Sequence, residues 1–404
     1  MKYIDGGVCA ALGFRANGIH CGIRKNKKKF DFSLIVSDTL ASVACVYTKN
    51  LVKGAPIYVT QQNVKDGYAQ AIVCNSGNAN TCNADGVEIA EGMCKLVERE
   101  TGIPYTNVVV ASTGVIGQPL SLEPMDEGIS ELVKGLGYDK SRDANLGIMT
   151  TDTMEKNVAV EFELGGKVCH IGGIAKGSGM IHPNMATMLC FITTDANITP
   201  DMLQKALSED VKSSFNMMSI DGDTSTNDTV ALLANGACGN AKIVEEGEDF
   251  DTFKTALGAV TKGLARAIAK DGEGASKLLI CNVTGAKDLE CARVVAKSVI
   301  TSALFKAAMF GADANWGRVL CAIGYSGADV DVNKIDVEFK SCAGVVKVCK
   351  MGSGIEFSEE EAKVVLSEHD IDINVNLNDG AVEATAWGCD LTYEYVRING
   401  DYRT

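Results

Sequence analysis

The stretch GGIAKGSGMIHPNMATMLCFITTDA, residues 172–196, joins a glycine-rich half to a dense apolar half. The glycines surround a single lysine, Lys176, and predict a flexible loop. The apolar run that follows Thr187 ends at two threonines and Asp195, and such a run is typical of a strand buried on both faces. Thr187 is therefore expected where a loop enters a buried strand.

This position of Thr187 fits a chain that cleaves itself. The hydroxyl can attack the carbonyl of the preceding residue, Ala186, move the acyl group from nitrogen to oxygen, and let water release two chains. Thr187 would then be N-terminal, and its α-amine, with an ordinary pKa of ~7.7–8.0, could serve as base for its own Oγ. Alternatively, Thr187 is simply a β-branched residue that starts a strand, and the local sequence taken alone favours this alternative.

The composition argues against several classes of protein. The chain has 404 residues, of which 46% are hydrophobic and 22% charged, as expected of a globular protein with a large core. Its 38 basic and 52 acidic residues give a net charge of −14, which argues against nucleic acid and anionic membranes as general partners. An anionic substrate would therefore need a local basic pocket.

The cysteines and histidines predict neither a disulfide framework nor a metal site. The 15 cysteines are scattered from Cys9 to Cys389 without a CxxC pair, which is typical of reduced thiols in a cytosolic protein. The four histidines form no HExxH motif and no His–Cys cluster, so we expect no metal. The N-terminus lacks the apolar core of a signal peptide, and no run is long enough to span a membrane, so we expect a cytoplasmic protein.

The pattern of apolar residues predicts strands alternating with helices. The clearest helix begins near Asp251 and carries an apolar stripe from Phe253 to Ile268 before it stops at Gly272. Short apolar runs between turn residues predict buried strands. We expect further helices over 86–100, 199–213, 289–309 and 358–367, and strands over 32–36, 42–47, 71–75, 108–111, 158–164, 230–234, 278–283, 371–377, 381–387 and 393–398.

Three features suggest places where a substrate could bind. The strand at 108–111 opens into a Ser-Thr-Gly turn, in which the Thr113 hydroxyl and the Gly114 N–H are candidate donors of an oxyanion hole. Glu273 follows the end of a helix, where a carboxylate could hold a substrate ammonium. The basic run at 24–29 could contact the phosphates of a carrier such as coenzyme A. Each feature also has a plain structural interpretation, as a turn or a solvated loop.

Several motifs occur together in one order along the chain. They are ASTGVIG at 111–117, GGIAKGSGMIHPNMATML at 172–189, DGDTSTNDT at 221–229, GEGASK at 272–277, ANWGR at 314–318 and the ending NGDYRT. On these motifs the chain resembles, over essentially its whole length, the ornithine acetyltransferase (glutamate N-acetyltransferase) family of the cyclic arginine pathway. The fold that this resemblance implies is α/β (α+β), a four-layer αββα sandwich similar to that of the N-terminal-nucleophile enzymes.

The resemblance implies self-cleavage between Ala186 and Thr187 into an α chain, 1–186, and a β chain, 187–404. The two chains would form one intertwined unit and pair again into an α₂β₂ heterotetramer. Thr187 would carry acetyl from N2-acetyl-L-ornithine to L-glutamate in a ping-pong reaction, with Thr113 and Gly114 as the oxyanion hole. The substrate-binding positions of the family fall on Thr150, Lys176, Thr187, Glu273, Asn399 and Thr404.

The range of substrates stays open at this point. The resemblance implies small-molecule substrates, namely N-acetylornithine, glutamate, ornithine and N-acetylglutamate, and no cofactor. Acetyl-CoA is a further acetyl donor in some members of the family, and the sequence does not decide whether it is one here. Two other classes of function remain. One is an autoprocessed N-terminal-nucleophile amidohydrolase or aminopeptidase, in which water replaces glutamate, and the other is a metabolite-binding protein that never cleaves.

Overall fold

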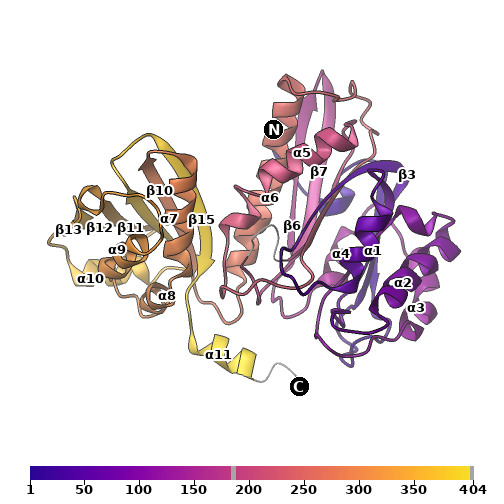
Figure 1. Cartoon of the computed structure of the whole chain (residues 1–404), viewed down its shortest axis with the longest axis horizontal. Helices are drawn as coiled ribbons and strands as arrows, with labels where there is room; N and C mark the ends of the chain where they lie inside the picture. Colours follow the sequence, from indigo (N-terminus) through magenta and orange to yellow (C-terminus); the bar gives the residue numbers. More distant parts are fainter. Residues whose placement is uncertain (183–187, 401–404) are drawn as a thin grey trace. The chain divides into compact units, whose positions relative to one another are not determined.

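The computed structural model describes residues 1–182 and 188–400, and this part of the chain divides into two compact units (Figure 1). Unit 1 comprises residues 1–177, 188–216 and 224–264. Unit 2 comprises residues 178–182, 217–223 and 265–400. Each unit is built on one β-sheet with helices packed against it.

The described residues of unit 1 form a mixed nine-stranded sheet. Its strand order is β1-β6-β7-β8-β9-β3-β4-β5, and β2 pairs with β3. The pairs β4–β5 and β8–β9 are parallel, and the others are antiparallel. The strands are β1 (Lys2–Ile4), β2 (Phe14–Ile19), β3 (Phe32–Tyr47), β4 (Tyr68–Asn75), β5 (Val108–Ser112), β6 (Lys156–Leu164), β7 (Lys167–Lys176), β8 (Leu189–Thr194) and β9 (Thr229–Ala234).

The long strand β3 connects two halves of this sheet that face each other. Its pairing with β4 shifts register between Val36 and Ala41, a bulge that bends a strand and increases its twist. Ile35 before the bulge and Val43 after it belong to one buried core, which also contains residues of β4 and β5 and of β7, β8 and β9. The expected strands at 32–36 and 42–47 are thus the two arms of one bent strand.

Helices cover the outer faces of both halves and complete four layers (Figure 1). One outer core joins β3, β4 and β5 to their covering helices, and Phe162 of β6 contacts Phe253 on the other side, with ring centroids 6.3 Å apart. The predicted αββα sandwich, and with it the α/β class, is confirmed. The first outer layer holds α1 (Ala55–Asn63), α2 (Gly86–Thr101) and α3 (Glu123–Lys134); the second holds α5 (Pro200–Asp210) and α6 (Glu248–Lys270); α4 (Ser141–Ile148) packs on β2 and β3.

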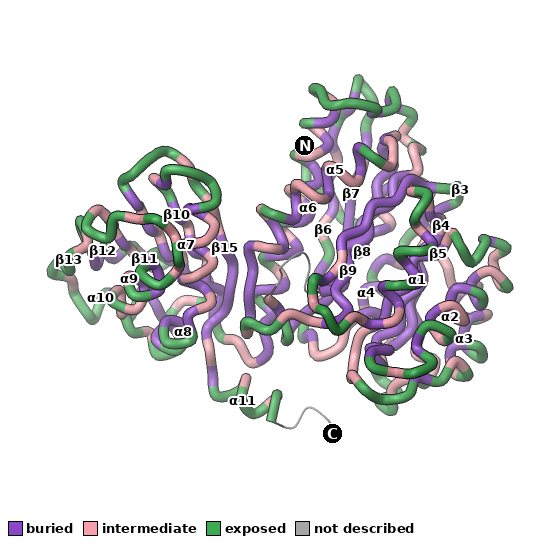
Figure 2. The backbone as a smooth tube through the Cα atoms, in the orientation of Figure 1, coloured by how far each residue is buried: buried purple, intermediate pink, exposed green. Residues whose placement is uncertain are grey.

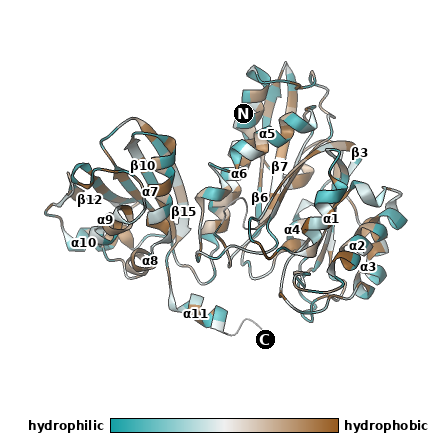
Figure 3. Cartoon of the chain, in the orientation of Figure 1, coloured by the Kyte–Doolittle hydropathy of each residue, from teal (hydrophilic) through white to brown (hydrophobic). Residues whose placement is uncertain are grey.

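The centre of unit 1 is strand β8, which lies between β7 and β9. Every residue of β8 and of β9 is buried (Figure 2). The prediction of a strand buried on both faces is therefore confirmed from Leu189 onward, whereas Thr187 lies outside the described residues. The apolar residues of the sequence collect on these central strands and on the inner faces of the helices (Figure 3).

Unit 2 contains a six-stranded sheet in its described part, in the order β13-β12-β11-β14-β10-β15. Helices α7 and α10 pack on it, and Phe305 of α8 stacks on Phe339 of β11 at 6.4 Å between ring centroids. The elements are β10 (Leu278–Ala286), α7 (Leu289–Thr301), α8 (Ala303–Phe310), α9 (Trp316–Gly324), β11 (Asp336–Ser341), β12 (Gly344–Lys350), β13 (Ser353–Gly354), α10 (Glu359–Leu366), β14 (Asp370–Asn376), β15 (Val382–Cys389) and α11 (Tyr393–Gly400).

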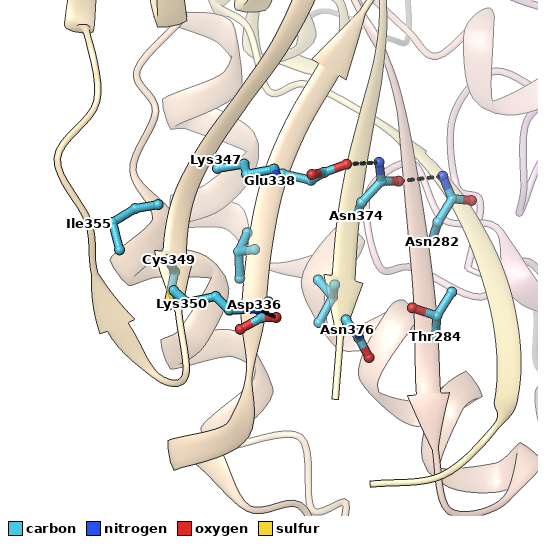
Figure 4. A pocket seen from close by; sticks show the side chains of 12 residues that line it. Asn282, Thr284, Asp336, Glu338, Lys347, Cys349, Lys350, Ile355, Asn374 and Asn376 are labelled. Carbon is cyan, nitrogen blue, oxygen red and sulfur yellow. Dashed lines mark hydrogen bonds and ion pairs between the residues drawn. The ribbon is translucent and has the colours of Figure 1, made fainter. Parts of the chain in front are cut away.

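One face of the unit 2 sheet carries a polar groove of about 430 Å³ (Figure 4). Asn282 on β10 donates to Asn374 on β14 over 3.0 Å, and Asn374 donates to Glu338 on β11 over 2.9 Å. Since these groups satisfy one another across neighbouring strands, the groove contains a hydrogen-bonded ladder that stabilises the register of the sheet.

Three expectations from the sequence are wrong, and contacts in the structure explain each of them. The glycine-rich segment 172–176 belongs to strand β7 instead of a loop. Gly172 has to be a glycine there because a Cβ would overlap the carbonyl oxygen of Gly7. Residues 393–398 form helix α11 instead of a strand, because Thr392 accepts the N–H of Tyr395 and the ion pair of Glu394 with Arg397 has helical spacing.

The expected long helix over 289–309 is a pair of helices, α7 and α8. The break falls at Ser302, whose hydroxyl accepts the N–H of Phe305 at 3.3 Å and so caps the second helix. A serine in that position satisfies a backbone donor that would otherwise lack a partner, which favours a new helix start over a continuous helix.

Candidate functional site

The Thr113–Gly114 turn follows β5 and is fixed by the neighbouring strand end. The N–H of Thr113 donates to the carbonyl of Asn75 over 3.0 Å. Gly114 has a φ of +133°, and a Cβ on it would lie 2.8 Å from the backbone nitrogen of Asn78. Only glycine combines that backbone conformation with so close an approach. The turn therefore holds the Gly114 backbone in one rigid position, as a set of preorganised donors requires.

Lys176 reaches the same turn from the last position of β7. Its Nζ donates to Oγ1 of Thr113 over 3.3 Å, so the structure brings these two predicted residues together. Lys176 is buried, and this burial lowers the pKa of its ammonium, while the carboxylate of Asp152 opposes the shift. A further anion that binds beside such a buried ammonium stabilises its charged form.

Asp152, which the sequence did not single out, organises the surroundings of Lys176. Its Oδ1 accepts from Nζ of Lys156 and from the N–H of Gly177, both over 2.7 Å, and its Oδ2 accepts the N–H of Thr150 over 2.9 Å. Burial raises the pKa of the Asp152 carboxyl, but the charges of Lys156 and Lys176 outweigh it and hold that pKa well below its usual range. Thr150 is thus placed by a charged, buried anchor.

A second buried carboxyl, Asp228, comes from the DGDTSTNDT segment. Its Oδ2 has no hydrogen-bond partner among the described residues, and burial raises the pKa of this group well above its ordinary value. The next residue, Thr229, donates its N–H to the carbonyl of Met188 over 2.9 Å. A neighbour in the same segment, Asn227, donates to the carbonyl of Ser112 over 2.9 Å and so supports the end of β5.

Glu273 and Asn399 meet in unit 2. Nδ2 of Asn399 donates to Oε2 of Glu273 over 2.8 Å, and the N–H of Glu273 donates to the carbonyl of Ser178 over 2.8 Å. The Glu273 carboxylate lies against Gly179, where a Cβ would overlap it, so that glycine makes room for the side chain. Glu273 is only 6% exposed, which contradicts the plain interpretation of a solvated loop residue.

The predicted site residues thus fall into two groups and an undescribed remainder. Thr113, Gly114, Thr150 and Lys176 lie in unit 1, and Glu273 and Asn399 lie in unit 2. Ala186, Thr187 and Thr404 lie outside the described residues. The sequence analysis missed Asp152, Lys156 and Asp228; the only local signal was the spacing of Asp152 and Lys156 by four positions, which became informative once both were seen to be buried.

None of the helices in the described part of the chain is long and apolar enough to cross a membrane.

Comparison with known proteins places the chain in one family. The ArgJ family model matches residues 15–404. The arginine biosynthesis bifunctional protein ArgJ of Caldanaerobacter subterraneus subsp. tengcongensis is 50% identical, with 100% of both chains covered. Arginine biosynthesis bifunctional protein ArgJ 1 of Clostridium acetobutylicum is also 50% identical, over 97% of this chain and 96% of the relative.

A solved structure agrees with these matches. The crystal structure of arginine biosynthesis bifunctional protein ArgJ from Bacillus halodurans is 48% identical and has a TM-score of 0.50. The match covers 52% of this chain and 98% of that one. The chain therefore belongs to the ArgJ family and, as the resemblance implied, is an acyltransferase of arginine biosynthesis.

Proposed function

We propose that this chain transfers acetyl from N2-acetyl-L-ornithine to L-glutamate by a ping-pong mechanism through an acetyl-threonine on Thr187. The observation that carries the proposal is the contact of Lys176 with Thr113. Since the lysine donates to the hydroxyl oxygen, the O–H of Thr113 is left to donate to an oxyanion beside the rigid Gly114 backbone. An amide is a poor acyl donor, so its cleavage needs such donors together with an activated nucleophile.

The reaction has two half-reactions that balance. Oγ of Thr187 attacks the acetyl carbonyl of N-acetylornithine while the α-amine of Thr187 takes the hydroxyl proton. That proton passes to the departing amine, and ornithine leaves. The amine of glutamate then attacks the acetyl ester, its proton returns through the same base, and N-acetylglutamate leaves with Thr187 regenerated. In both steps the Thr113 hydroxyl and the Gly114 N–H stabilise the oxyanion.

The remaining proposed roles follow the charges of the substrates. Both amino acids carry an α-carboxylate, and Lys176 supplies a cation for it. Glu273, with Asn399 hydrogen-bonded to it, supplies a carboxylate for the side-chain ammonium of ornithine. Thr150 and Thr404 complete the set of binding residues that the family resemblance implies. No cofactor and no metal take part in this scheme.

Acetyl-CoA is proposed as a second acetyl donor. Arg24, Lys28 and Lys29 line a cavity of about 150 Å³ that Asp152 also lines. These cations could contact the phosphates of coenzyme A close to the residue that anchors Thr150. Acetylation of glutamate by acetyl-CoA in the absence of N-acetylornithine tests this second activity directly.

We further propose that the chain cleaves itself between Ala186 and Thr187 and that its two chains stay together as an α₂β₂ heterotetramer in the cytoplasm. Strand β7 belongs to the proposed α chain, and β8 to the β chain; the two pair side by side from Ile171 with Thr194 to Lys176 with Leu189. A ladder of backbone hydrogen bonds between buried strands supports association after cleavage.

The experiment that tests the proposal is the substitution of Thr187. Thr187→Ala should give a single chain of 42.7 kDa and no turnover, whereas Thr187→Ser, which keeps a hydroxyl, should still be processed. Release of more than one ornithine per enzyme molecule from N-acetylornithine should depend on added glutamate. Normal processing of Thr187→Ala would contradict the proposal, and ornithine release that is indifferent to glutamate would favour an amidohydrolase.

A further inference from the structure

Two cysteines meet at the edge of the unit 1 sheet, outside the residues assigned to catalysis. Cys169 lies near the start of β7, and Cys238 lies in the turn that follows β9. Since β7 runs antiparallel to β8 and β8 runs parallel to β9, the start of β7 and the ends of β8 and β9 share one edge. There the two Sγ atoms are 2.8 Å apart. Lys176 occupies the other end of β7.

The distance between the sulfurs favours a bond between them over a shared metal ion. Two thiolates bound to one zinc at ~2.3 Å in tetrahedral geometry would lie roughly 3.8 Å apart. A disulfide bond is ~2.03–2.05 Å long, so closing it requires less than about 1 Å of movement. Asp195 completes a possible ligand set with the cysteines, but its carboxylate already accepts the N–H groups of Leu12 and His170 over 3.0 and 2.7 Å.

The surroundings of Cys238 make it the nucleophilic member of the pair. The hydrogen bond between the two sulfurs lowers the pKa of Cys238, although burial opposes this shift, and Sγ of Cys238 also donates to Oδ1 of Asn240 over 3.0 Å. Thiolate is the reactive form, so a lowered pKa increases the reactivity of Cys238. Cys238 is half-buried and its neighbour Gly239 is exposed, whereas Cys169 is buried. A small oxidant therefore meets Cys238 first.

We propose that Cys169 and Cys238 form a redox modification site that a hydroperoxide converts into a disulfide. The Cys238 thiolate attacks one oxygen of hydrogen peroxide, the O–O bond breaks, and with one proton taken up the products are a sulfenic acid and water. The Cys169 sulfur then attacks the sulfenic sulfur, the S–O bond breaks, and the thiol proton leaves with hydroxide as a second water. Two thiols lose two electrons in total, and the peroxide is reduced to two waters.

If the chain cleaves itself as proposed above, this disulfide would also link the two resulting chains. Cys169 precedes the bond between Ala186 and Thr187, and Cys238 follows it. In a cleaved protein the disulfide would therefore join the α chain covalently to the β chain, at the edge of the sheet where β7 and β8 are already paired. The disulfide itself needs no cleavage; only the joining of two chains rests on the proposed function.

The test treats the purified full-length protein with hydrogen peroxide, alkylates the remaining thiols and maps the peptides by mass spectrometry. The proposal expects one linked pair, Cys169 with Cys238, lighter by two hydrogens and released by dithiothreitol. Cys238→Ser should abolish this pair, and Cys82→Ser, which changes an exposed cysteine, should leave it unchanged. Oxidation of Cys238 to sulfinic acid without a link, or native mass spectrometry that finds zinc protecting both thiols, would overturn it.

Electrophoresis of the same samples separates this proposal from the proposed self-cleavage. If both hold, the oxidised protein runs as one band of 42.7 kDa without reductant and as two bands with it. If the disulfide forms in a protein that does not cleave, the peptide map is positive and the reduced protein stays one band, as Thr187→Ala should. If the protein cleaves and no disulfide forms, two bands persist without reductant and the inference fails.

Discussion

The buried pair of Asp152 and Lys156 gives the sharpest prediction about stability. Nζ of Lys156 lies 2.7 Å from Oδ1 of Asp152, and both side chains are 0% exposed. In Asp152→Asn the charges of Lys156 and Lys176 would stay buried without the carboxylate that faces them. Removing one partner of a buried ion pair costs ~3–5 kcal/mol, so we expect the free energy of unfolding to fall by that amount.

Urea denaturation followed by near-ultraviolet circular dichroism measures this loss. The matched control is Glu155→Gln, which removes a neighbouring ion pair whose partner, Arg142, has a side chain 73% exposed. Exposed ion pairs contribute ~0–1 kcal/mol to stability, so Glu155→Gln should lower the free energy of unfolding by no more than that. An Asp152→Asn protein as stable as the control would refute the assignment of Asp152 as a charged anchor.

The Asp152 carboxylate also makes the stability of the protein depend on pH. Folding lowers the pKa of the Asp152 carboxyl below its value in the unfolded chain, which is ~3.9. The carboxylate therefore contributes its full stabilisation above about pH 3.9, and this contribution declines as the pH falls toward the pKa of the folded state. Acid titration of the wild type should therefore show a stability loss below about pH 4 that Asp152→Asn lacks. Equal acid profiles for the two proteins would argue against a charged Asp152.

Three further predictions concern the candidate site. Gly114→Ala should lower kcat by ~10²–10³-fold because its Cβ would meet the nitrogen of Asn78, whereas Gly117→Ala, which shares the strain of a positive φ but leaves open space for a Cβ, should lower kcat far less; equal kcat values would contradict the oxyanion role. Burial lowers the pKa of Lys176, so the ammonium loses its charge at a lower pH than an exposed lysine would, and KM for N-acetylornithine should begin to rise at that lower pH. Lys176→Met should raise KM and remove this dependence of KM on pH. Glu273→Gln should raise KM for N-acetylornithine about tenfold or more, since hydrogen bonds to charged groups contribute ~1.5–3 kcal/mol, and an unchanged KM would exclude the ammonium role.

Local patterns in the sequence predicted the elements whose residues carry the signal themselves. The stripe from Phe253 to Ile268 marked α6, and the apolar run after Met188 marked β8. The pattern failed for β7, where the deciding contact comes from a residue distant in the sequence, and for α11, whose local signals for a helix were overlooked. The glycines of β7 predict a loop from the sequence alone, but Gly172 is required in the strand because the backbone of Gly7 packs against it. Helix α11 looks like a strand until Thr392 and the pairing of Glu394 with Arg397 are taken into account.

The candidate site shows the same division. Thr113 and Gly114 were found from their own turn, because a strand that opens into a glycine turn exposes backbone donors. Asp152 was missed because its role depends on burial, which the fold alone determines. The pair of Cys169 and Cys238 was missed because 69 positions separate residues that only the order of β7, β8 and β9 brings together.

The central claim is that the bond before Thr187 is broken and that the exposed threonine carries acetyl. Intact-mass analysis of protein incubated with N-acetylornithine, without glutamate and then denatured, tests both parts at once. The account predicts two chains, of which the one that starts at Thr187 carries a single acetyl group that added glutamate removes. A single unacetylated chain of 42.7 kDa in active protein would contradict it.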